Sequence, residues 1–308
     1  MTFKRKTGWT PEQLGDLSGR RYLITGGNSG IGLEAAKILA EKGADIVIAC
    51  RNPAKAEEAV ADIDAVGAGA VDSVPLDLSS MASVRKAAKE VNKRYDSLDG
   101  LINNAGIMQT PETRTEDGFE LQLGTNHLGH FLLAGLLYEL VEKAGGRIVV
   151  VSSVAHKLGK INLDDLMQES SYNASTAYGQ SKLANLMFAL ELDRRLQEAG
   201  STVRAVACHP GYSDTRLQST GPTGALASIY TVLNRVWAQS AYDGAIPTVL
   251  AAADDDARSG AYYGPGSLME SLGPVGEASI SRRARNKKVA AALWQRSEEL
   301  VGHNWQFA

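Results

Sequence analysis

The sequence predicts an α/β domain in which helices cover both faces of a doubly wound parallel sheet. Short β-branched runs, such as Arg21–Thr25 and Asp45–Cys50, alternate with longer stretches of helical periodicity. This rhythm continues as far as Cys208, with no internal repeat and no low-complexity linker. Strand–helix–strand units of this kind form parallel sheets with right-handed crossovers. We therefore expect one domain over residues 19–308, preceded by an arm of residues 1–18.

The elements expected in this domain follow one another in order. β-Branched and apolar runs predict strands at Arg21–Thr25, Asp45–Cys50, Val71–Leu76, Gly100–Asn103, Arg147–Val151 and Val203–Cys208. A period near 3.6 predicts helices at Gly30–Lys42, Ala54–Val66, Met81–Tyr95, Phe119–Ala144 and around Tyr178 to about Glu198. The irregular segment 213–243 carries Gly, Pro, Leu and aromatic residues, which suggests a small substrate lid inserted above the sheet.

Composition and charge narrow the class of protein. A chain with 44% hydrophobic and 22% charged residues is typical of globular proteins, and its net charge of -3 gives no electrostatic reason to expect a nucleic-acid partner. The two cysteines lie in apolar runs, which indicates neither a disulfide framework nor a zinc cluster. The first residues do not resemble a signal peptide, and no apolar run is long enough to span a bilayer. We expect a cytoplasmic protein without a membrane span.

A glycine-rich turn follows the first predicted strand directly and precedes a helix. Its sequence, Thr25-Gly-Gly-Asn-Ser-Gly-Ile-Gly32, departs from the G-x-G-x-x-G spacing. Backbone N–H groups at such a turn, together with the helix dipole, face the pyrophosphate of a dinucleotide. Glycine turns also serve plain chain reversal, but this one stands where a dinucleotide fingerprint requires it. The turn therefore predicts a single-domain Rossmann fold that binds NAD(P).

The residues after the second predicted strand indicate which cofactor binds. A carboxylate there would hydrogen-bond the ribose 2′-hydroxyl and favour NAD(H). This chain has Arg51 and Asn52 instead, and a guanidinium binds a 2′-phosphate through paired hydrogen bonds. We expect NADP(H) to be preferred and NAD(H) to be possible; the alternative is a solvated Arg51 at a strand end. Asp77 is predicted either to accept from the adenine amino group or to cap the next helix, in competition with Ser79 and Ser80.

Tyr178 and Lys182 are four residues apart in a predicted helix, so both side chains lie on one face. A phenol alone is a poor proton donor or acceptor at neutral pH, because its reference pKa is about 10. A neighbouring ammonium favours the phenolate and makes it a better acid–base group. The pair by itself is a weak pattern, since both residue types are common on helix surfaces. A catalytic role for the pair is favoured only when the other motifs of the chain are considered with it.

A series of motifs in this order resembles the short-chain dehydrogenase/reductase family. They are the Thr25–Gly32 turn, Asn103-Asn-Ala-Gly106, Asn126, Ser153, the Tyr178 and Lys182 pair, and Pro210-Gly211 with Thr215. Within the family, the chain is most similar to the group of retinol dehydrogenases and protochlorophyllide reductases. That similarity lies in Asn28, Ala49-Cys-Arg-Asn52, Asn126-His-Leu-Gly-His-Phe-Leu132 and Ser152-Ser-Val-Ala-His156.

The resemblance implies a catalytic site of Asn126, Ser153, Tyr178 and Lys182. Tyr178 would exchange a proton with the carbonyl or alcohol oxygen, and Ser153 would hydrogen-bond the same oxygen. Lys182 would favour the Tyr178 phenolate and bind the nicotinamide ribose hydroxyls. Asn126 would interrupt or cap its helix and hold a water that continues the proton relay; the alternative is an ordinary amide on the helix face. Ser152 competes with Ser153 for the catalytic role and is expected to be structural.

The resemblance also implies contacts with the cofactor and the substrate. The cofactor contacts are Gly26, Asn28, Ser29, Gly30, Ile31, Arg51, Asn52, Asp77, Leu78, Asn104, Ala105, Gly106, Tyr178, Lys182, Pro210, Gly211 and Thr215. The apolar residues of 213–243 favour a hydrophobic alcohol, aldehyde or ketone, with His156, Tyr212 and Leu217 as candidate substrate contacts; the alternative is that these residues bury the segment against the domain or form a subunit contact. No metal site is expected. Family members often pair through two long helices, here Phe119–Ala144 and Tyr178–Glu198, so a homodimer or homotetramer is possible.

Two other functions remain open from the sequence. A catalytically silent NADP(H)-binding regulator would share the fold, although such proteins usually lose the Tyr or the Lys. A C=C reductase of the protochlorophyllide-reductase type characteristically carries Cys directly after Pro-Gly, where this chain has Tyr212. Outside the site, His127 and His130 are expected to pack or hydrogen-bond locally, and the basic run Ser281–Lys288 to form a solvated helix face.

Overall fold

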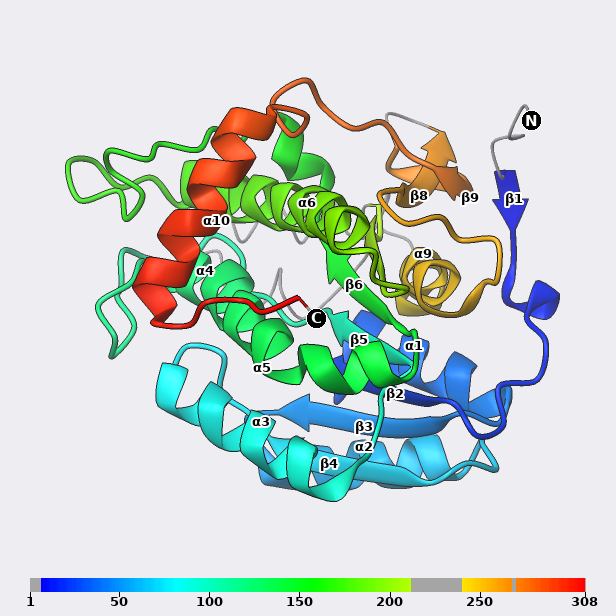
Figure 1. Ribbon diagram of the computed structural model, residues 1–308. Coiled ribbons are helices and arrows are strands. Elements are labelled where there is room, and N and C mark those ends of the chain that lie inside the picture. Colours follow the sequence, from blue (N-terminus) through cyan, green and yellow to red (C-terminus); the bar gives the residue numbers. More distant parts are fainter. Residues whose placement is uncertain (1–6, 212–239, 268–269, 308) are drawn as a thin grey trace.

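The computed structural model describes residues 7–211, 240–267 and 270–307, and their strands join in one sheet (Figure 1). The order across this nine-stranded sheet is β1-β9-β8-β7-β6-β5-β2-β3-β4. Strands β2 to β8 are parallel to one another, whereas β9 pairs antiparallel with β8 and β1. The strands are β1 (Thr7–Trp9), β2 (Arg21–Thr25), β3 (Asp45–Cys50), β4 (Val71–Pro75), β5 (Gly100–Asn103), β6 (Arg147–Val151), β7 (Arg204–Cys208), β8 (Tyr262–Ser267) and β9 (Leu272–Glu277).

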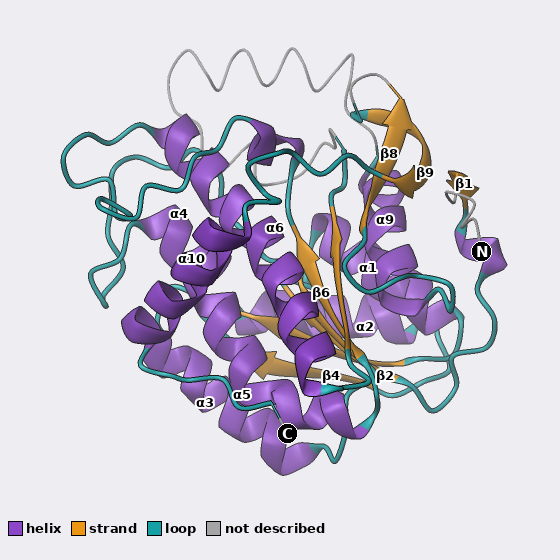
Figure 2. Ribbon diagram, turned by 45° about the horizontal axis from the view of Figure 1, so that its top comes forward, coloured by secondary structure: helices purple, strands orange, loops and turns teal. Residues whose placement is uncertain are grey.

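Helices cover both faces of the sheet (Figure 2). Helices α1, α2 and α9 pack on one face, and α3, α5 and α6 pack on the other, where α10 lies outside α6. The helices are α1 (Gly30–Glu41), α2 (Pro53–Asp64), α3 (Met81–Arg94), α4 (Leu121–Leu123), α5 (Gly129–Lys143), α6 (Ala174–Ala199), α9 (Ala241–Ala253) and α10 (Lys287–Val301). Successive strand residues enter opposite layers, as Leu23 and Ile24 do. The predicted doubly wound Rossmann fold is therefore confirmed.

Most element boundaries lie at or within two residues of those predicted, and the long stretch 119–144 is the exception. It divides into α4, a π-helical turn η2 (Gly124–Leu128) and α5. A π-helical turn widens the backbone ring by one residue and interrupts the α-helical hydrogen-bond ladder. The interruption falls on Asn126, where the resemblance places it.

The chain before β2 is more ordered than a plain arm. Strand β1 pairs with β9, and the buried Trp9 donates a hydrogen bond from its indole N–H to Asp254. Two 3-10 turns, η1 (Pro11–Gln13) and η3 (Val154–Lys157), complete the described helices. A three-residue strand is too short to show a period of two in the sequence.

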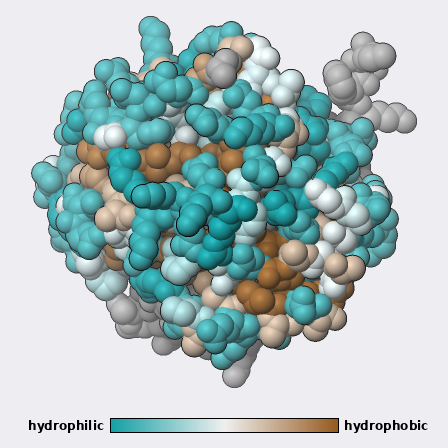
Figure 3. Space-filling view, turned by 60° about the horizontal axis from the view of Figure 1, so that its bottom comes forward, coloured by the Kyte–Doolittle hydropathy of each residue, from teal (hydrophilic) through white to brown (hydrophobic). Residues whose placement is uncertain are grey.

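The predicted lid, 213–243, lies outside the described residues except for 240–243. There Ser240 caps α9 by accepting a hydrogen bond from Asp243 N at 3.1 Å. Polar and charged side chains cover most of the face drawn in Figure 3, with apolar patches between them. None of the helices that the structure describes combines the length and the apolar character that a membrane span requires.

Candidate active site

The predicted site residues that are described gather where the parallel strands end. Gly26 follows β2, Arg51 follows β3, Asn104 follows β5, and Ser152 and Ser153 follow β6. In open α/β sheets, ligands bind outside the carboxyl ends of the strands. The topology therefore gathers motifs that are far apart in the sequence at one edge of the molecule.

The glycine-rich turn needs its glycines for two separate reasons. Gly26 and Gly30 have φ values of 66° and 53°, in the left-handed region that favours glycine. At Gly32, a Cβ would lie 2.5 Å from both the Gly26 carbonyl oxygen and Asn104 Nδ2. The amino end of α1 is thus packed directly onto the turn, so its free N–H groups face the carboxyl edge of the sheet.

Thr25 joins this turn to the Asn103–Gly106 segment. Its Oγ1 accepts hydrogen bonds from Asn104 N at 2.9 Å and from Ala105 N at 3.0 Å. In return, Asn104 Nδ2 donates to the Thr25 carbonyl oxygen at 2.9 Å. The glycine-rich turn and the Asn103–Gly106 segment, both predicted to contact the cofactor, are therefore hydrogen-bonded to each other. Together they form one continuous surface, called the cofactor surface below.

Arg51 and Asp77 lie together at the open end of this surface. The Arg51 side chain is 78% exposed, and its Nη1 is 3.9 Å from Asp77 Oδ2. Asp77 Oδ1 accepts from Ser79 N at 2.9 Å, while the cap of α3 is Ser80, which accepts from Ser83 N at 3.2 Å. Of the alternatives for Asp77, the helix-cap role thus falls to Ser80.

Other predicted cofactor contacts are also engaged within the protein. Asn52 accepts a hydrogen bond from Lys55 N and so caps α2. Leu78 is buried, and its carbonyl oxygen packs so closely on Gly129 that a Cβ there would lie 2.3 Å from it. Both residues hold neighbouring helices in place at the edge of the site.

Lys182 is buried beside Tyr178 on α6. Its Nζ donates to the Val151 carbonyl oxygen at 3.2 Å and lies 5.8 Å from the centre of the Tyr178 ring. A Cβ at Gly106 would lie only 3.5 Å from this ammonium. Burial lowers the pKa of Lys182 to about 8, because desolvation disfavours its charged form. The structure thus brings the predicted Tyr and Lys together, with Lys182 buried and Tyr178 partly exposed.

Asn126 uses its side-chain amide to hold the segment that follows Gly106. Its Oδ1 accepts from Ile107 N at 2.8 Å, and its Nδ2 donates to the Ile107 carbonyl oxygen at 2.9 Å and to Ser181 Oγ at 3.0 Å. These three bonds fasten the Ile107 backbone to α6, next to Lys182. The side chain of Asn126 therefore supports the backbone at Gly106, which faces Lys182 and is called the Gly106 wall of the site below.

The two serines after β6 have different surroundings. Ser152 is buried, and its hydroxyl donates to the Lys182 carbonyl oxygen at 2.7 Å. Ser153 is partly exposed at the start of η3, where its Oγ accepts from Ala155 N at 3.2 Å. Ser152 thus has a partner within the protein, and Ser153 is the more exposed of the two serines.

His156, a candidate substrate contact, is fully buried behind Ser153. Its Nδ1 lies 2.7 Å from the Ser153 carbonyl oxygen, and its ring meets that of Tyr262 edge-on at 5.4 Å. Across the site, Gly211 N donates to His209 Nδ1 at 3.2 Å, which fixes the Pro210–Gly211 turn. Tyr212, Thr215 and Leu217 lie outside the described residues.

His130 connects the cofactor surface to Asn126, a link that was not predicted from the sequence. His130, expected only to bond locally, lies 2.8 Å from Thr25 Oγ1 through Nε2 and 2.9 Å from the Asn126 carbonyl oxygen through Nδ1. The second contact is local, but the first spans more than one hundred residues of sequence. Only the repeated histidine in Asn126-His-Leu-Gly-His could have drawn attention to it.

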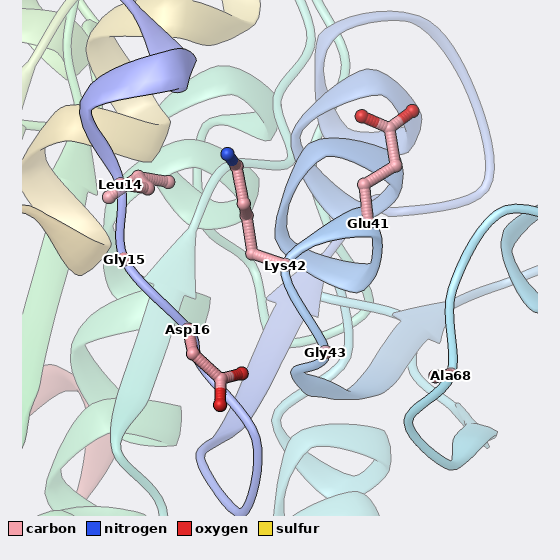
Figure 4. Close-up of a pocket in the computed structure, with 7 residues that line it drawn as sticks. All are labelled: Leu14, Gly15, Asp16, Glu41, Lys42, Gly43 and Ala68. Carbon is pink, nitrogen blue, oxygen red and sulfur yellow. The ribbon is translucent and has the colours of Figure 1, made fainter.

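A shallow depression elsewhere does not belong to this site (Figure 4). Its volume is about 440 Å³, and Leu14, Asp16, Glu41, Lys42 and Ala68 are among its lining residues. These residues precede β2, β3 and β4, so the depression lies at the amino ends of the strands. Within the residues that the structure describes, no group of three or more His, Cys, Asp or Glu side chains could hold a metal ion.

The fold, the glycine-rich turn and the buried Lys182 beside Tyr178 define the class of Rossmann-fold dehydrogenases. The profile of the family described as short chain dehydrogenase matches residues 20–223. Retinol dehydrogenase 14 of Mus musculus is 40% identical over 303 residues, covering 94% of this chain and 87% of the relative. Retinol dehydrogenase 13 of Homo sapiens is 40% identical over 303 residues, covering 96% and 88%. The chain therefore belongs to the short-chain dehydrogenase family, in its retinol-dehydrogenase-like group.

Solved structures agree with this assignment. The crystal structure of an uncharacterized protein from Mycobacterium paratuberculosis is 42% identical, with a TM-score of 0.81, and the match covers 97% of this chain and all of the other. A short chain dehydrogenase from Burkholderia cenocepacia, solved in complex with NADP, is 27% identical with a TM-score of 0.63. That match covers 80% of this chain and 96% of the other. The family and this complex support binding of a nicotinamide cofactor.

Proposed function

We propose that this chain is an NADP(H)-dependent oxidoreductase that transfers a hydride between nicotinamide and a hydrophobic alcohol, aldehyde or ketone. The observation that carries the proposal is the enclosed position of Lys182, beside the Tyr178 ring and the Gly106 backbone. A tyrosine that exchanges protons near neutral pH requires such a neighbouring ammonium. An ordinary solvated lysine would lie in water, whereas this side chain is 3% exposed.

Four residues have roles in the proposed reaction. Tyr178 donates a proton to the substrate oxygen during reduction and takes it back during oxidation. Ser153 donates a hydrogen bond to the same oxygen and stabilises its negative charge. Lys182, whose pKa is about 8, is mostly protonated at neutral pH and favours the phenolate. Asn126 holds the Gly106 wall in place, and the bound nicotinamide supplies or accepts the hydride.

The residues at the carboxyl edge fit a nicotinamide dinucleotide. The left-handed glycines of the turn allow a pyrophosphate to approach the backbone at the amino end of α1. Arg51 is exposed and only loosely paired with Asp77, so its guanidinium is available to a 2′-phosphate. This availability supports NADP(H) over NAD(H). The adenine would then lie near Asp77, whose side chain remains at the surface of the site.

The substrate class rests on the relatives and on the sequence of the proposed lid. The relatives are named as retinol dehydrogenases, and retinol is a long apolar alcohol. The apolar character of the sequence 213–243, with Tyr212 just before it and Leu217 near its start as the candidate contacts, supports a substrate of similar character. A hydrophobic primary alcohol or its aldehyde is therefore the first substrate to examine.

The subunit count and the location are further proposals. A homodimer or homotetramer built on α5 and α6 would need their outer faces, and α10 already packs on both helices. Trp305 and Phe307 add further cover over Tyr138 of α5. Light scattering on the purified chain would measure how many subunits associate. The cytoplasmic location predicted from the sequence is testable by cell fractionation.

The deciding experiment combines binding and turnover. Tryptophan fluorescence would measure NADPH and NADH binding, and the loss of NADPH absorbance would report turnover over a panel of carbonyls that includes retinaldehyde. Tyr178→Phe should reduce turnover by about a thousandfold or more while NADPH binding persists. Tyr95→Phe, which removes a distant hydroxyl bonded to Asp72, should leave both unchanged. Tight NADPH binding without turnover of any substrate would favour the silent regulator instead.

A further inference from the structure

His130 is fully enclosed in α5, and both nitrogens of its ring are engaged. Nε2 lies 2.8 Å from the hydroxyl oxygen of Thr25, next to the glycine-rich turn. Nδ1 lies 2.9 Å from the carbonyl oxygen of Asn126, in the π-helical turn η2. One side chain thus touches both the cofactor surface and the residue that supports Lys182.

The direction of these hydrogen bonds follows from the chemistry of the partners. A carbonyl oxygen only accepts, so Nδ1 carries the ring proton and donates to Asn126. Burial lowers the pKa of His130 to about 3, so the ring is neutral and Nε2 is an acceptor. The Thr25 hydroxyl therefore donates to Nε2 at 2.8 Å, in preference to the Ile102 carbonyl oxygen at 3.4 Å, while its oxygen accepts from Asn104 N and Ala105 N. Every donor in the series has an acceptor.

These hydrogen bonds hold the backbone that lies beside the reacting groups. Asn104 and Ala105 lead into Gly106, and Asn126 clamps Ile107 immediately after it. Gly106 is the backbone that faces Lys182 Nζ. Both ends of the segment Asn104–Ile107 are therefore connected, through Thr25 or through Asn126, to the same imidazole.

We propose that His130 is a positioning residue, which holds the Asn104–Ile107 segment between the bound cofactor and Lys182. The proposal rests on the proposed function, because it assigns His130 to the same reaction. It predicts that the hydrogen bond between Nε2 and Thr25 governs cofactor affinity, since Thr25 joins the glycine-rich turn to the Asn103–Gly106 segment. It also predicts that the hydrogen bond between Nδ1 and Asn126 governs turnover, since Asn126 fixes the wall beside Lys182.

His127 provides a matched control three residues earlier. It is equally buried, and burial lowers its pKa to about 4. Its Nε2 meets Ser297 Oγ of α10 at 3.0 Å, and its ring packs near Phe131 and Phe188. A substitution there disturbs the core to a similar extent, but on the side away from the cofactor surface.

The first test compares His130→Phe with His127→Phe in the full-length chain. Both variants should lower Tm. His130→Phe should also raise the Kd for NADPH about tenfold and lower kcat about tenfold, because it leaves Thr25 and Asn126 without their partner. His127→Phe should keep Kd and kcat within about twofold of wild type. Equal effects of the two variants on Kd and kcat would overturn the role of His130.

The second test separates the two halves of the ring. An Asn amide nitrogen reaches the position of Nδ1, and a Gln amide oxygen reaches that of Nε2. His130→Gln should therefore recover more of the NADPH affinity than of kcat, and His130→Asn should do the reverse. Identical partial recovery of both quantities in both variants would show a general packing role and contradict the proposal.

A double-mutant cycle provides the third test. Thr25→Val removes the same hydrogen bond from the other side, so the Kd of Thr25→Val/His130→Phe should stay close to that of the weaker-binding single variant. A Kd raised by the product of the two single effects would overturn the proposed link. A wild-type chain that binds neither NADPH nor NADH would overturn the proposed function and this role together, whereas normal wild-type turnover with equal histidine variants would overturn this role alone.

Discussion

Helices α5 and α6 each contribute to two buried regions of opposite character. Toward the carboxyl edge of the sheet they present polar groups, with His130 on α5 and Ser181 and Lys182 on α6. Toward α10 they contribute Phe131 and Phe188 to an aromatic cluster, which Trp294 of α10 and Trp305 after it complete. Its neighbouring rings lie 5.0 to 5.8 Å apart, at the spacing of favourable aromatic pairs.

The difference between the regions lies in what burial does to each. Enclosing apolar rings stabilises the fold, whereas enclosing an ammonium costs free energy that hydrogen bonds only partly return. Arg195 strengthens the aromatic side by lying 4.5 Å over the Trp294 ring. We infer that the aromatic cluster anchors the two helices so firmly that the polar site can remain in an unfavourable arrangement.

The largest expected effect is the fall in kcat/KM when Lys182 is replaced. Lys182→Met should lower kcat/KM by about a thousandfold or more, because Tyr178 loses the charge that favours its phenolate. The free energy of unfolding should stay the same or rise, since a buried cation is removed and Asn185 Nδ2 still donates to the Val151 carbonyl oxygen at 3.2 Å. Steady-state kinetics and urea unfolding measure the two quantities. A large fall in the free energy of unfolding of Lys182→Met would contradict the idea that the polar site, unlike the aromatic cluster, does not stabilise the fold.

The opposite pattern is expected at Trp294. Trp294→Ala should lower the free energy of unfolding by about 3–5 kcal/mol, because it leaves a cavity in the aromatic cluster. Measured well below Tm, kcat/KM should remain within about twofold of wild type. Trp294→Phe serves as the control and should lose less stability. A tenfold fall in kcat/KM while the alanine variant is still folded would show that the two regions are not separable.

A pH series sharpens the energetic side of the comparison. The pKa of Lys182 is lowered from 10.5 to about 8 in the fold, so between these values the unfolded chain binds the proton and the folded chain does not. Stability therefore rises with pH over this window, by about 3 kcal/mol at most. Lys182→Met lacks this rise, so the free energy of unfolding of wild type minus that of the variant should increase from pH 7 to pH 10, which reduces or reverses any excess stability of the variant at pH 7. A constant difference would contradict the burial of an ionisable amine.

The smallest effect is expected at the exposed rim of the site. Arg51→Asp should shift the preference from NADPH toward NADH by about ten- to a hundredfold, because a carboxylate repels the 2′-phosphate and accepts from a ribose hydroxyl. Stability should change by less than about 0.5 kcal/mol. Arg51→Gln, as control, should weaken NADPH binding without improving that of NADH. An unchanged preference in Arg51→Asp would place 2′-phosphate recognition elsewhere.

The strand boundaries could be predicted from the sequence because residues close together in the chain determine them. Strands β2, β3, β5 and β6 have the predicted bounds, since their β-branched runs end at glycine or polar residues. The interruption at Asn126 was also predicted, although only through the resemblance. The basic run 281–288 was mostly misinterpreted as a helix face, because α10 begins only at Lys287 and Arg283 donates to the Gly159 carbonyl oxygen.

What the sequence could not predict depends on distant partners. The pairing of β1 with β9 and the contact between His130 and Thr25 join segments that nothing nearby in the chain specifies. The same holds for the cover of α10 over α5 and α6. The motifs predicted which residues gather at the site, but not which bonds hold them there.

The π-helical turn also fixes the rotation of α5 about its own axis. Each residue of an α-helix advances the chain by about 100°, so one residue more or fewer in Gly124–Leu128 would turn all of α5 by about that angle. His130 would then point away from Thr25 and Phe131 away from Trp294, although neither residue had changed. A single-residue deletion in this turn would therefore damage the polar site and the aromatic cluster together. The length of this turn sets the phase of the helix for both regions.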